Sequence, residues 1–481
     1  MYPLNEIFPF VKKVIVIGAG PAGIAAAYKL SKEGAEVKVF EASPYIGGMS
    51  RSFDLWNQRV DLGPHRFFSK EPKVNDFFDE IIKDDYTIVN RITRIYYNNR
   101  FFDYPLKLFN VLSNLNPFVI VSILYHYCRQ RLFPIKNPKS FEEWVTNRFG
   151  YKLYSIFFKN YTEKLWGIPG SKIDADWAAQ RIKGLSLTEA VINSVKGNKG
   201  NKHKTLVDVF KYPKNGTGAL YDKAANSIIE NGGVILKEYP VEELIIEDNV
   251  CKGIKTVDGE VHYADNVVSS MPITSLIKGI YNVPNDVIEA NSKLYFRNTI
   301  LVYLEINRDD LFKDNWIYIH SPQVKHGRIT NFRNWCPSLN GTSKSTILCM
   351  EFWAFDNDDI WSATDEYLAN KAIAELKELN LIDKNEECKK HKILRVPKCY
   401  PVYETGYKKH LKTIEQFLNS IEHLMPIGRY GAFKYNNQDH SILMGVLAAE
   451  NILHDKGVDL WEINTDTEYQ EDGEVKDVLI Q

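Results

Sequence analysis

Hydrophobic and polar positions follow a regular order near the start of the chain. Residues 13–41 open with an apolar run of strand length, pass through a glycine-rich turn into an amphipathic helical pattern, and finish in a second strand that closes at Glu41. This order predicts a βαβ unit. Since 481 residues are long for a single hydrophobic core, we expect two interleaved or consecutive domains.

The periodicity changes several times in the rest of the chain. Residues 100–190 combine aromatic and helical patterns with prolines, which predicts a mostly helical inserted region. Polar, glycine-punctuated residues 196–204 predict a mobile surface loop. Short alternating strands over 233–270 indicate that the chain returns to the first sheet. Strand patterns over 299–351, followed by a helical pattern over 365–379, predict a second sheet that covers a cavity.

The glycine turn carries the most specific chemistry in the sequence. Residues 14–23, VIVIGAGPAG, follow the order of a dinucleotide-binding unit, and a coincidental glycine turn is the alternative. Gly18 permits the tight turn, Gly20 lets the backbone approach a pyrophosphate, and Gly23 lets the helix pack on the sheet. The helix N-terminus then offers N–H groups to the phosphates. Glu41 is placed to accept hydrogen bonds from both ribose hydroxyls.

Composition narrows the classes of partner. Lys and Arg total 60 and Asp and Glu total 61, so the chain lacks the positive field of a nucleic-acid-binding protein and we expect no such partner. Six scattered cysteines without a CxxC pair predict neither a zinc site nor a disulfide framework. We therefore expect no metal and a reducing, cytoplasmic location.

One apolar stretch is a candidate for contact with a membrane. Phe118–Cys128 is followed by Arg129 and Arg131, and its eleven residues are too few to span a bilayer as a helix. We therefore expect no integral membrane segment. A buried helix is the favoured interpretation of this stretch, and a helix that lies on a membrane surface is the alternative.

A second glycine pair bears on the choice between flavin and nicotinamide cofactors. Gly47 and Gly48 follow Glu41 and precede Arg51, and this arrangement resembles the amine oxidase and protoporphyrinogen oxidase superfamily of flavoenzymes. Segments similar to that superfamily then follow in the same order, at 212–220, 240–244 and 264–272. The resemblance implies FAD as the cofactor. It places Gly48 and Arg51 near the pyrophosphate and the flavin edge, and the backbone of Val241 near the adenine.

Three further blocks resemble the UDP-galactopyranose mutases within that superfamily. They are GPHRF at 63–67, YTEKLWG at 161–167 and GRYGAFKYNNQ at 428–438. The resemblance implies that His65, Trp166, Arg429 and Tyr435 are candidate catalytic residues, and that Arg429 also contacts the flavin. A helix predicted from Ser441 would direct its N-terminal dipole toward the flavin ring.

Structural alternatives accompany these assignments. His65 beside Pro64 also fits an ordinary turn, and Trp166 and Tyr435 also fit a hydrophobic core. Arg429, between two glycines, is typical of a residue that holds an anion in a pocket.

The sequence departs from the mutases at three positions. Leu185 stands where they usually carry a diphosphate-binding arginine, and Asn437 and Gln438 stand where they carry Asp and Met. The candidates to supply the missing charge, with surface arginines as the alternative, are Arg297, Arg328 and Arg333.

Two enzyme classes remain open. The resemblance implies a nucleotide-sugar mutase that interconverts pyranose and furanose forms of a UDP-sugar with reduced flavin. The alternative is an FAD-dependent oxidase or dehydrogenase of the protoporphyrinogen oxidase or amine oxidase type, and a catalytically inert flavin-binding protein is a third class. Either enzyme takes a small-molecule substrate. Because the sequence has no second GxGxxG, we expect NAD(P)H or another electron donor or acceptor to bind transiently.

The expected fold is α/β, with a Rossmann-type FAD-binding domain of the GR2-like kind, an inserted helical region and a second, antiparallel sheet over the substrate cavity. The expected segments are 1–100, 205–290 and 411–461 for the FAD-binding domain, 101–200 for the helical insertion, 291–410 for the cavity sheet and its helix, and 462–481 for an acidic tail.

Overall fold

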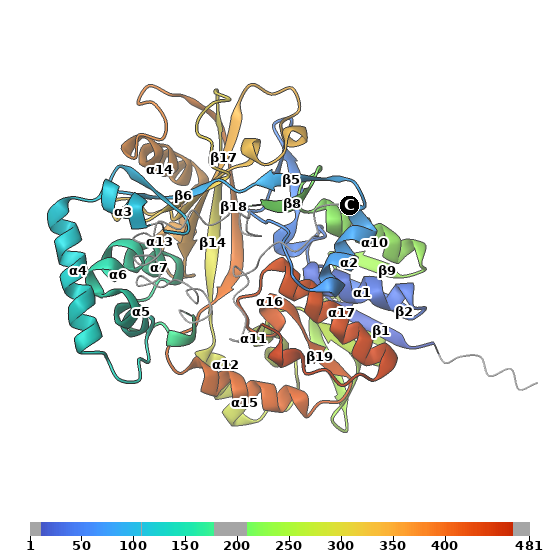
Figure 1. The fold of residues 1–481 in the computed structure, drawn as a ribbon. Helices are drawn as coiled ribbons and strands as arrows, with labels where there is room; N and C mark the ends of the chain where they lie inside the picture. Colours follow the sequence, from blue (N-terminus) through green and yellow to red (C-terminus); the bar gives the residue numbers. More distant parts are fainter. Residues whose placement is uncertain (1–10, 107, 178–208, 465–481) are drawn as a thin grey trace, which may run out of the picture.

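The computed structural model describes residues 11–106, 108–177 and 209–464. Figure 1 shows a parallel sheet with its helices on one side of the molecule, a long second sheet through the middle, and a group of helices on the far side. The predicted loop at 196–204, Leu185 and residues 465–481 of the predicted tail lie outside the described residues.

The predicted βαβ unit is present. β1 (Lys13–Ile17), α1 (Pro21–Lys32) and β2 (Glu36–Glu41) follow one another, and β1 pairs in parallel with β2. Residues 14–17 of β1 are almost fully buried, as expected for a central strand of a parallel sheet.

Later parts of the chain complete a five-stranded parallel sheet around this unit. In spatial order its strands are β19 (Leu424–Pro426), β13 (Asn266–Ser269), β1, β2 and β9 (Val234–Lys237). A three-stranded antiparallel sheet lies between β9 and β13 in the sequence, and its strands are β10 (Val241–Glu247), β11 (Val250–Thr256) and β12 (Val261–Tyr263). The predicted return of the chain to the first sheet over 233–270 is therefore confirmed.

Helices pack closely on this sheet. α1 contacts both α10 (Ala219–Glu230) and α17 (Gln438–His454), and α2 (Pro72–Ile82) contacts the same two helices. A Cβ atom on Gly445 of α17 would overlap the carbonyl oxygen of Ala22 in α1. The glycine therefore sets how near these two helices lie.

The predicted second sheet has seven strands. In spatial order they are β18 (Cys388–Pro401), β14 (Phe296–Ile306), β17 (Thr346–Ala354), β16 (Arg328–Asn331), β15 (Trp316–Ile319), β6 (Thr93–Tyr97) and β7 (Arg100–Asp103). Its pairs are antiparallel except for β6 with β15, which are parallel. β6 comes from the segment 1–100 that was expected to belong to the FAD-binding domain. The predicted helix near 365–379 is α14 (Asp365–Glu378), which contacts β14 and β18.

Two further sheets consist of two antiparallel strands each. β3 (Ser52–Leu55) pairs with β4 (Gln58–Asp61), and β5 (Tyr86–Asn90) pairs with β8 (Val209–Pro213). The remaining helices of the C-terminal half are α11 (Ile273–Lys278), α12 (Asn285–Lys293), α13 (Asp359–Ser362), α15 (Tyr407–Asn419) and α16 (Gly428–Gly431).

The described residues between β7 and β8 are mostly helical. The helices there are α3 (Leu108–Asn114), α4 (Pro117–Leu132), α5 (Phe141–Phe149), α6 (Tyr151–Phe157) and α7 (Lys159–Trp166). The favoured interpretation of Phe118–Cys128 as a buried helix is wrong. α4 forms the outer edge of the molecule (Figure 1), where Phe118 is 85% exposed and Tyr125 is 63% exposed. Over the described ranges, no helix combines the length and apolar character that a membrane crossing needs.

Candidate active site

A pocket lies at the carboxyl ends of three parallel strands. Gly20 follows β1, Ser270 follows β13 and Gly428 follows β19, and all three line it. The opposite side is lined from the seven-stranded sheet, by residues of β15, β16 and β18. Ligands of open parallel sheets bind at this edge, so the fold places the pocket where a cofactor is expected.

The glycine loop forms a cradle without side chains. A Cβ atom on Gly20 would come no nearer than 3.9 Å to another protein atom, the Cα atom of Gly48. Gly48 has a φ of +51°, and its Cβ would lie 3.0 Å from the Cα atom of Gly20. The two glycines thus face each other at the N-terminus of α1, whose first-turn N–H groups have no acceptor within the helix. This opening fits the pyrophosphate of a dinucleotide.

The other two glycines of the motif, Gly18 and Gly23, allow close packing within the protein. Gly18 has a φ of +93°, and a side chain there would overlap Ser270. A Cβ atom on Gly23 would overlap the carbonyl oxygen of Gly18. Gly23 therefore allows α1 to lie directly against the loop, as the sequence predicts.

Glu41 holds the glycine loop in place. Its Oε2 atom accepts a hydrogen bond of 2.7 Å from the Ala19 N–H, and its Oε1 atom accepts one of 2.9 Å from the Ser43 N–H. Each carboxylate oxygen keeps a second lone pair. The predicted contact of Glu41 with a ribose stays a prediction, and it would be made by a side chain that the loop has already fixed.

A buried carboxylate orders the turn that leads to His65. Asp61 is fully buried, and its carboxylate accepts hydrogen bonds from Ser52 Oγ at 2.5 Å, Tyr212 OH at 2.7 Å and the Thr217 N–H at 3.2 Å. Its carbonyl oxygen accepts a further bond of 2.8 Å from Tyr303 OH. Burial raises the pKa of Asp61 to about 6, although these donors favour its charged form.

His65 is a neutral side chain at the wall of the pocket. Burial, together with the positive charges of Arg328 and Arg429, lowers the pKa of His65 to about 3. Its Nδ1 atom lies 3.2 Å from the carbonyl oxygen of Gly63, which can only accept a hydrogen bond. Nδ1 therefore carries the proton, and Nε2 is left as a hydrogen-bond acceptor.

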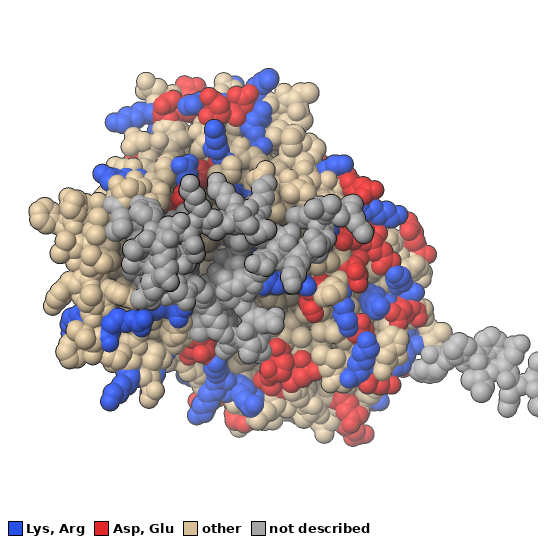
Figure 2. Space-filling view, viewed as in Figure 1, with Lys and Arg blue, Asp and Glu red and all other residues tan. Residues whose placement is uncertain are grey.

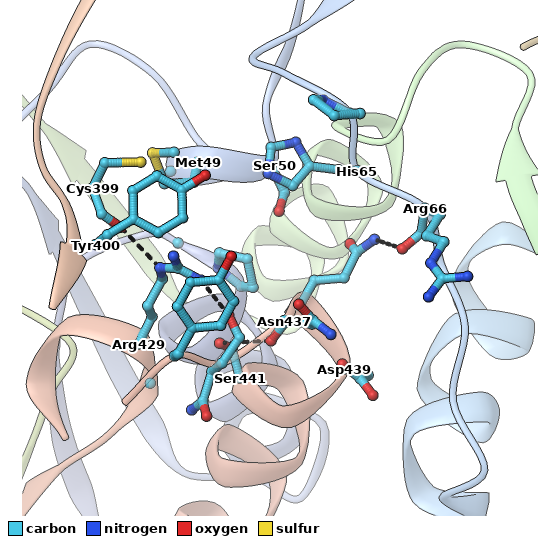
Figure 3. A pocket seen from close by; sticks show the side chains of 18 of the residues that line it. Met49, Ser50, His65, Arg66, Cys399, Tyr400, Arg429, Asn437, Asp439 and Ser441 are labelled. Atoms are coloured by element: carbon cyan, nitrogen blue, oxygen red, sulfur yellow. Dashed lines mark hydrogen bonds between the residues drawn. The ribbon is translucent and has the colours of Figure 1, made fainter. Parts of the chain in front are cut away.

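Arg429 lies against two aromatic rings. Its guanidinium lies 4.7 Å from the ring centre of Tyr400 and 4.5 Å from that of Tyr435. Nε donates to the carbonyl of Cys399 at 2.9 Å and Nη1 to that of Asn436 at 2.7 Å, as Figure 3 shows. Burial works to lower the pKa of Arg429, but the neighbouring Tyr435, Cys399 and Tyr400 raise it above its ordinary value.

The charge of Arg429 is not neutralised within the described part of the chain, because none of the carboxylates there lies within ion-pair distance of its guanidinium. Arg328, in contrast, binds the buried Glu351 through two hydrogen bonds of 2.5 and 2.6 Å. Both arginines line the pocket, together with Arg66 and Arg91, whereas Asp439 is the one carboxylate among its described lining residues. The pocket is therefore suited to anionic ligands.

The N-terminus of α17 also reaches the pocket. Asn437, Gln438 and Ser441 line it, so the helix begins three residues earlier than the predicted start at Ser441. Gln438 accepts a bond of 2.7 Å from Tyr221 OH and donates one of 2.7 Å to the carbonyl of Arg66. It thereby joins α10, the histidine turn and the start of α17.

Besides Gly18, Gly23 and Glu41, three predicted site residues lie away from the pocket lining. Trp166 is fully buried, with its ring 5.8 Å from Tyr435, so it packs behind the wall instead of facing the cavity. Arg51 stacks over Tyr45 at 4.3 Å, and Val241 begins β10. The predicted contacts of these residues with flavin, adenine or substrate stay predictions.

The two other candidate arginines are also placed elsewhere. Arg297 is buried and bonds to Asp358 at 2.8 Å and to the carbonyl of Trp353 at 2.9 Å, so it is not a surface residue. Arg333 donates to the carbonyls of Ser343 and Ser345. Of the three arginines proposed to supply charge, Arg328 is the one that lines the pocket.

Sequence reasoning missed one end of the pocket. Arg91, Tyr104 and Tyr318 line it, with the Tyr104 and Tyr318 rings 5.0 Å apart and the Arg91 guanidinium 5.7 Å from the Tyr104 ring. These residues come from the segments around β6, β7 and β15, which meet only in the folded sheet. The sequence contains no spacing that relates them. Groups of three or more His, Cys, Asp or Glu side chains able to hold a metal do not occur in the described part of the chain.

Sequence comparisons find flavoenzymes. The family model described as flavin-containing amine oxidoreductase matches residues 21–410. The chain is 28% identical over 174 residues to a Klebsiella pneumoniae protein named "Probable UDP-galactopyranose mutase", which covers 34% of this chain and 43% of that protein. It is 38% identical over 90 residues to a 1-hydroxycarotenoid 3,4-desaturase of Flavobacterium sp. (strain P99-3), covering 18% of each. These matches thus span less than half the length of either relative.

Structural comparisons extend over nearly the whole chain. A crystal structure of reduced UDP-galactopyranose mutase superposes with a TM-score of 0.83 and 23% identity, covering 93% of this chain and 97% of that chain. Cyclohexylamine oxidase from Brevibacterium oxydans IH-35A gives a TM-score of 0.64 and 15% identity, covering 92% and 98%. At identities this low, the superpositions show a shared fold and nothing more.

Substitution of Gly20 should affect FAD binding, whereas substitution of Gly23 should affect the stability of the fold. Gly20→Val should abolish most FAD binding, because the side chain would occupy the pyrophosphate position. The apo-protein should stay folded, because the added Cβ would meet the Gly48 Cα atom only at an ordinary contact distance of 3.9 Å. Gly23→Ala should instead destabilise the protein by about 1–3 kcal/mol, because its Cβ would overlap the Gly18 carbonyl. Flavin absorbance after gel filtration and the thermal midpoint of the apo-protein measure the two effects. Full flavin occupancy in Gly20→Val would refute the assignment.

The raised pKa of Asp61 predicts a pH dependence of stability. Its pKa rises from 3.8 to about 6 on folding, so the folded protein holds this proton where the unfolded chain has lost it. The stability contribution of Asp61 therefore falls as the pH rises from about 4 to about 6, by on the order of 2–3 kcal/mol. Asp61→Asn should lack this loss of stability. Thermal unfolding at several pH values between about 4 and 6 would show it as a difference in slope between the wild-type and variant plots of thermal midpoint against pH. Asp248→Asn, at an exposed turn, is the control and should run parallel to the wild type.

Proposed function

The chain belongs to the flavin-containing amine oxidoreductase family, its cofactor is FAD, and we propose that it is a nucleotide-sugar mutase of the UDP-galactopyranose mutase type. The observation that carries the proposal is Arg429 at the pocket, whose described hydrogen-bond partners are carbonyl oxygens and not carboxylates. FAD brings one pyrophosphate, and the glycine cradle at α1 is suited to it. The charge of Arg429 calls for a further anionic ligand.

Arg429 is the best candidate to bind a substrate diphosphate. Its guanidinium remains charged, and its described hydrogen-bond partners are two carbonyl oxygens, neither of which neutralises it. The rings of Tyr400 and Tyr435 are 5.5 Å apart and nearly parallel, and they restrict the guanidinium to one orientation. A fixed, unneutralised arginine loses little freedom when it binds a diphosphate.

The far end of the pocket supports a nucleotide as the carrier of that diphosphate. Tyr104, Trp316 and Tyr318 give this end aromatic surface, and Arg91 stacks on Tyr104. A planar base can stack on such rings while an arginine contacts phosphate oxygens. A simple amine substrate would need neither the arginines nor an extended aromatic site.

The protein's own residues supply the setting for the reaction. Bound FAD, when reduced, supplies an electron-rich ring that can act as a nucleophile. The N-terminus of α17 faces the pocket and favours negative charge on its ligand. Neutral His65 offers Nε2 as a hydrogen-bond acceptor for a sugar or flavin N–H or O–H group.

Two of the substitutions relative to the mutases lie at the start of α17 and line the pocket. Gln438, where the mutases carry Met, forms hydrogen bonds with Tyr221 and the Arg66 carbonyl and so fixes the start of α17. Asn437, where they carry Asp, is the N-cap residue of the same helix. Asn437 in place of that Asp removes one negative charge near Arg429, and this change favours binding of an anionic substrate.

A direct assay distinguishes the mutase from the oxidase alternative. FAD-loaded protein reduced with dithionite under anaerobic conditions should convert UDP-galactopyranose and UDP-galactofuranose into one another, as followed by chromatography. The oxidised protein should be inactive, and UDP-galactose should not bleach its flavin absorbance. Absence of conversion, together with bleaching by an amine or amino acid, would replace the mutase with an oxidase or dehydrogenase.

Substitutions in the arginine and tyrosine pair test the binding site. Arg429→Ala should weaken UDP-sugar binding by roughly 2–4 kcal/mol, because a desolvated anion loses its charged partner, and Arg429→Lys should recover only part of this loss. Tyr435→Phe removes one hydroxyl and should weaken binding by about tenfold or less. Isothermal titration with UDP-sugar would measure all three variants.

A matched control separates binding from folding. Arg333→Ala removes an arginine that bonds to backbone carbonyls away from the pocket, and it should leave UDP-sugar affinity unchanged. Flavin spectra should show that each variant retains FAD. Wild-type affinity in both Arg429→Ala and Tyr435→Phe would make the C-terminal segment structural and remove the main support for the mutase proposal.

A further inference from the structure

Helix α4 (Pro117–Leu132) exposes a row of large apolar side chains. Phe118 is 85% exposed, Val121 65%, Tyr125 63% and Leu132 74%. Their spacing along the helix places them on one face, since residues three, seven and fourteen positions apart recur on the same side. Phe133, directly after the helix, is 71% exposed and lengthens the row.

The opposite face of α4 already packs against the protein. Ile123 and Gln130 are buried there, and the helix contacts α5 and α6. The protein therefore covers one face of α4 and leaves the row of apolar side chains on the other face uncovered. A contiguous row of exposed large apolar side chains marks a site of contact with a partner or a membrane.

The stretch of chain that contains α4 carries charge of one sign. Between Asp103 and Glu142 the sequence contains no acidic residue. The basic side chains of Arg129, Arg131 and Lys136 are exposed at and beyond the end of α4. Figure 2 shows the same arrangement at the left edge of the molecule, where an uncharged surface is followed below by blue side chains.

We propose that α4 and the residues up to Lys136 dock the protein on the surface of an anionic lipid membrane. Phe118, Val121, Tyr125, Leu132 and Phe133 enter the boundary between headgroups and acyl chains, and the basic residues bind the headgroup phosphates. With 16 residues, the helix is about 24 Å long, so it lies along the membrane and does not cross it.

A second copy of the chain fits this face less well. Most homodimers are related by a two-fold axis, which places the same patch of both copies face to face. The exposed arginines and the lysine would then meet their own copies, with no acidic residue between positions 103 and 142 to pair with them. An anionic membrane supplies the complementary charge. This inference is independent of the reaction that the pocket performs.

Vesicle sedimentation with the full-length, FAD-loaded protein tests the proposal. The protein should sediment with phosphatidylcholine vesicles that contain phosphatidylglycerol, much less with pure phosphatidylcholine, and less at high salt because the headgroup attraction is screened. Phe118→Ser combined with Leu132→Ser should lower the partition coefficient by about tenfold or more, because both side chains enter the lipid. Arg129→Glu combined with Arg131→Glu should abolish the preference for anionic vesicles.

Matched controls show whether the effect belongs to this face. Tyr263→Ser with Tyr281→Ser removes equally exposed apolar side chains elsewhere, where the two tyrosines are 68% and 88% exposed. Lys389→Glu with Lys392→Glu reverses two exposed charges on β18. Both controls should bind vesicles as the wild type does, and all variants should retain FAD and the wild-type thermal midpoint.

Three results would overturn the proposal. The first is a wild-type protein that stays in solution with anionic vesicles. The second is an equal loss of binding in the control variants. The third is a wild-type dimer in light scattering that Phe118→Ser with Leu132→Ser converts to a monomer, with no vesicle binding, which would make this face an interface between copies.

Discussion

The buried carboxylate of Asp61 joins the parts of the molecule that build the pocket. Its hydrogen-bond donors come from β3, β8 and the start of the segment that leads into α10, and its carbonyl is bound by Tyr303 of β14. Burying a carboxylate is costly unless donors replace water, so each of these elements must hold its place for the others to be stable. The histidine turn begins two residues later. Its position relative to β3, β8 and β14 therefore depends on this one residue.

The arginines divide into those that complete the fold and those that remain for a ligand. Arg297 and Arg328 are each paired with a carboxylate, and a buried arginine without such a partner would be expensive. Arg429 is held instead by carbonyl oxygens and aromatic rings, which fix its direction while leaving its charge. This difference distinguishes a binding arginine from a structural one, and it is visible only when the partners are known.

Local sequence patterns predicted those features that depend on neighbours in the chain. The βαβ unit, the return of the chain at β9 and β13, and α14 follow from periodicity, and the glycine motif follows from the backbone it requires. The exposure of α4 could not be predicted, because an apolar helix of this length has the same pattern whether its outer face is covered or not. Trp166 shows the same limit, since burial behind a pocket and contact with the pocket both suit a tryptophan.

The hydrogen bonds of Glu41 at the cofactor site could not be predicted from the sequence either. Glu41 was expected to bind a ribose, yet its two oxygens already accept hydrogen bonds from Ala19 and Ser43. The side chain therefore holds the glycine loop in the conformation that a pyrophosphate needs before any cofactor arrives. A loop ordered in advance does not have to lose its freedom on binding, so more of the contact energy appears as affinity. The same carboxylate thus shapes the loop by accepting hydrogen bonds from its backbone, and each oxygen keeps a lone pair for a further donor.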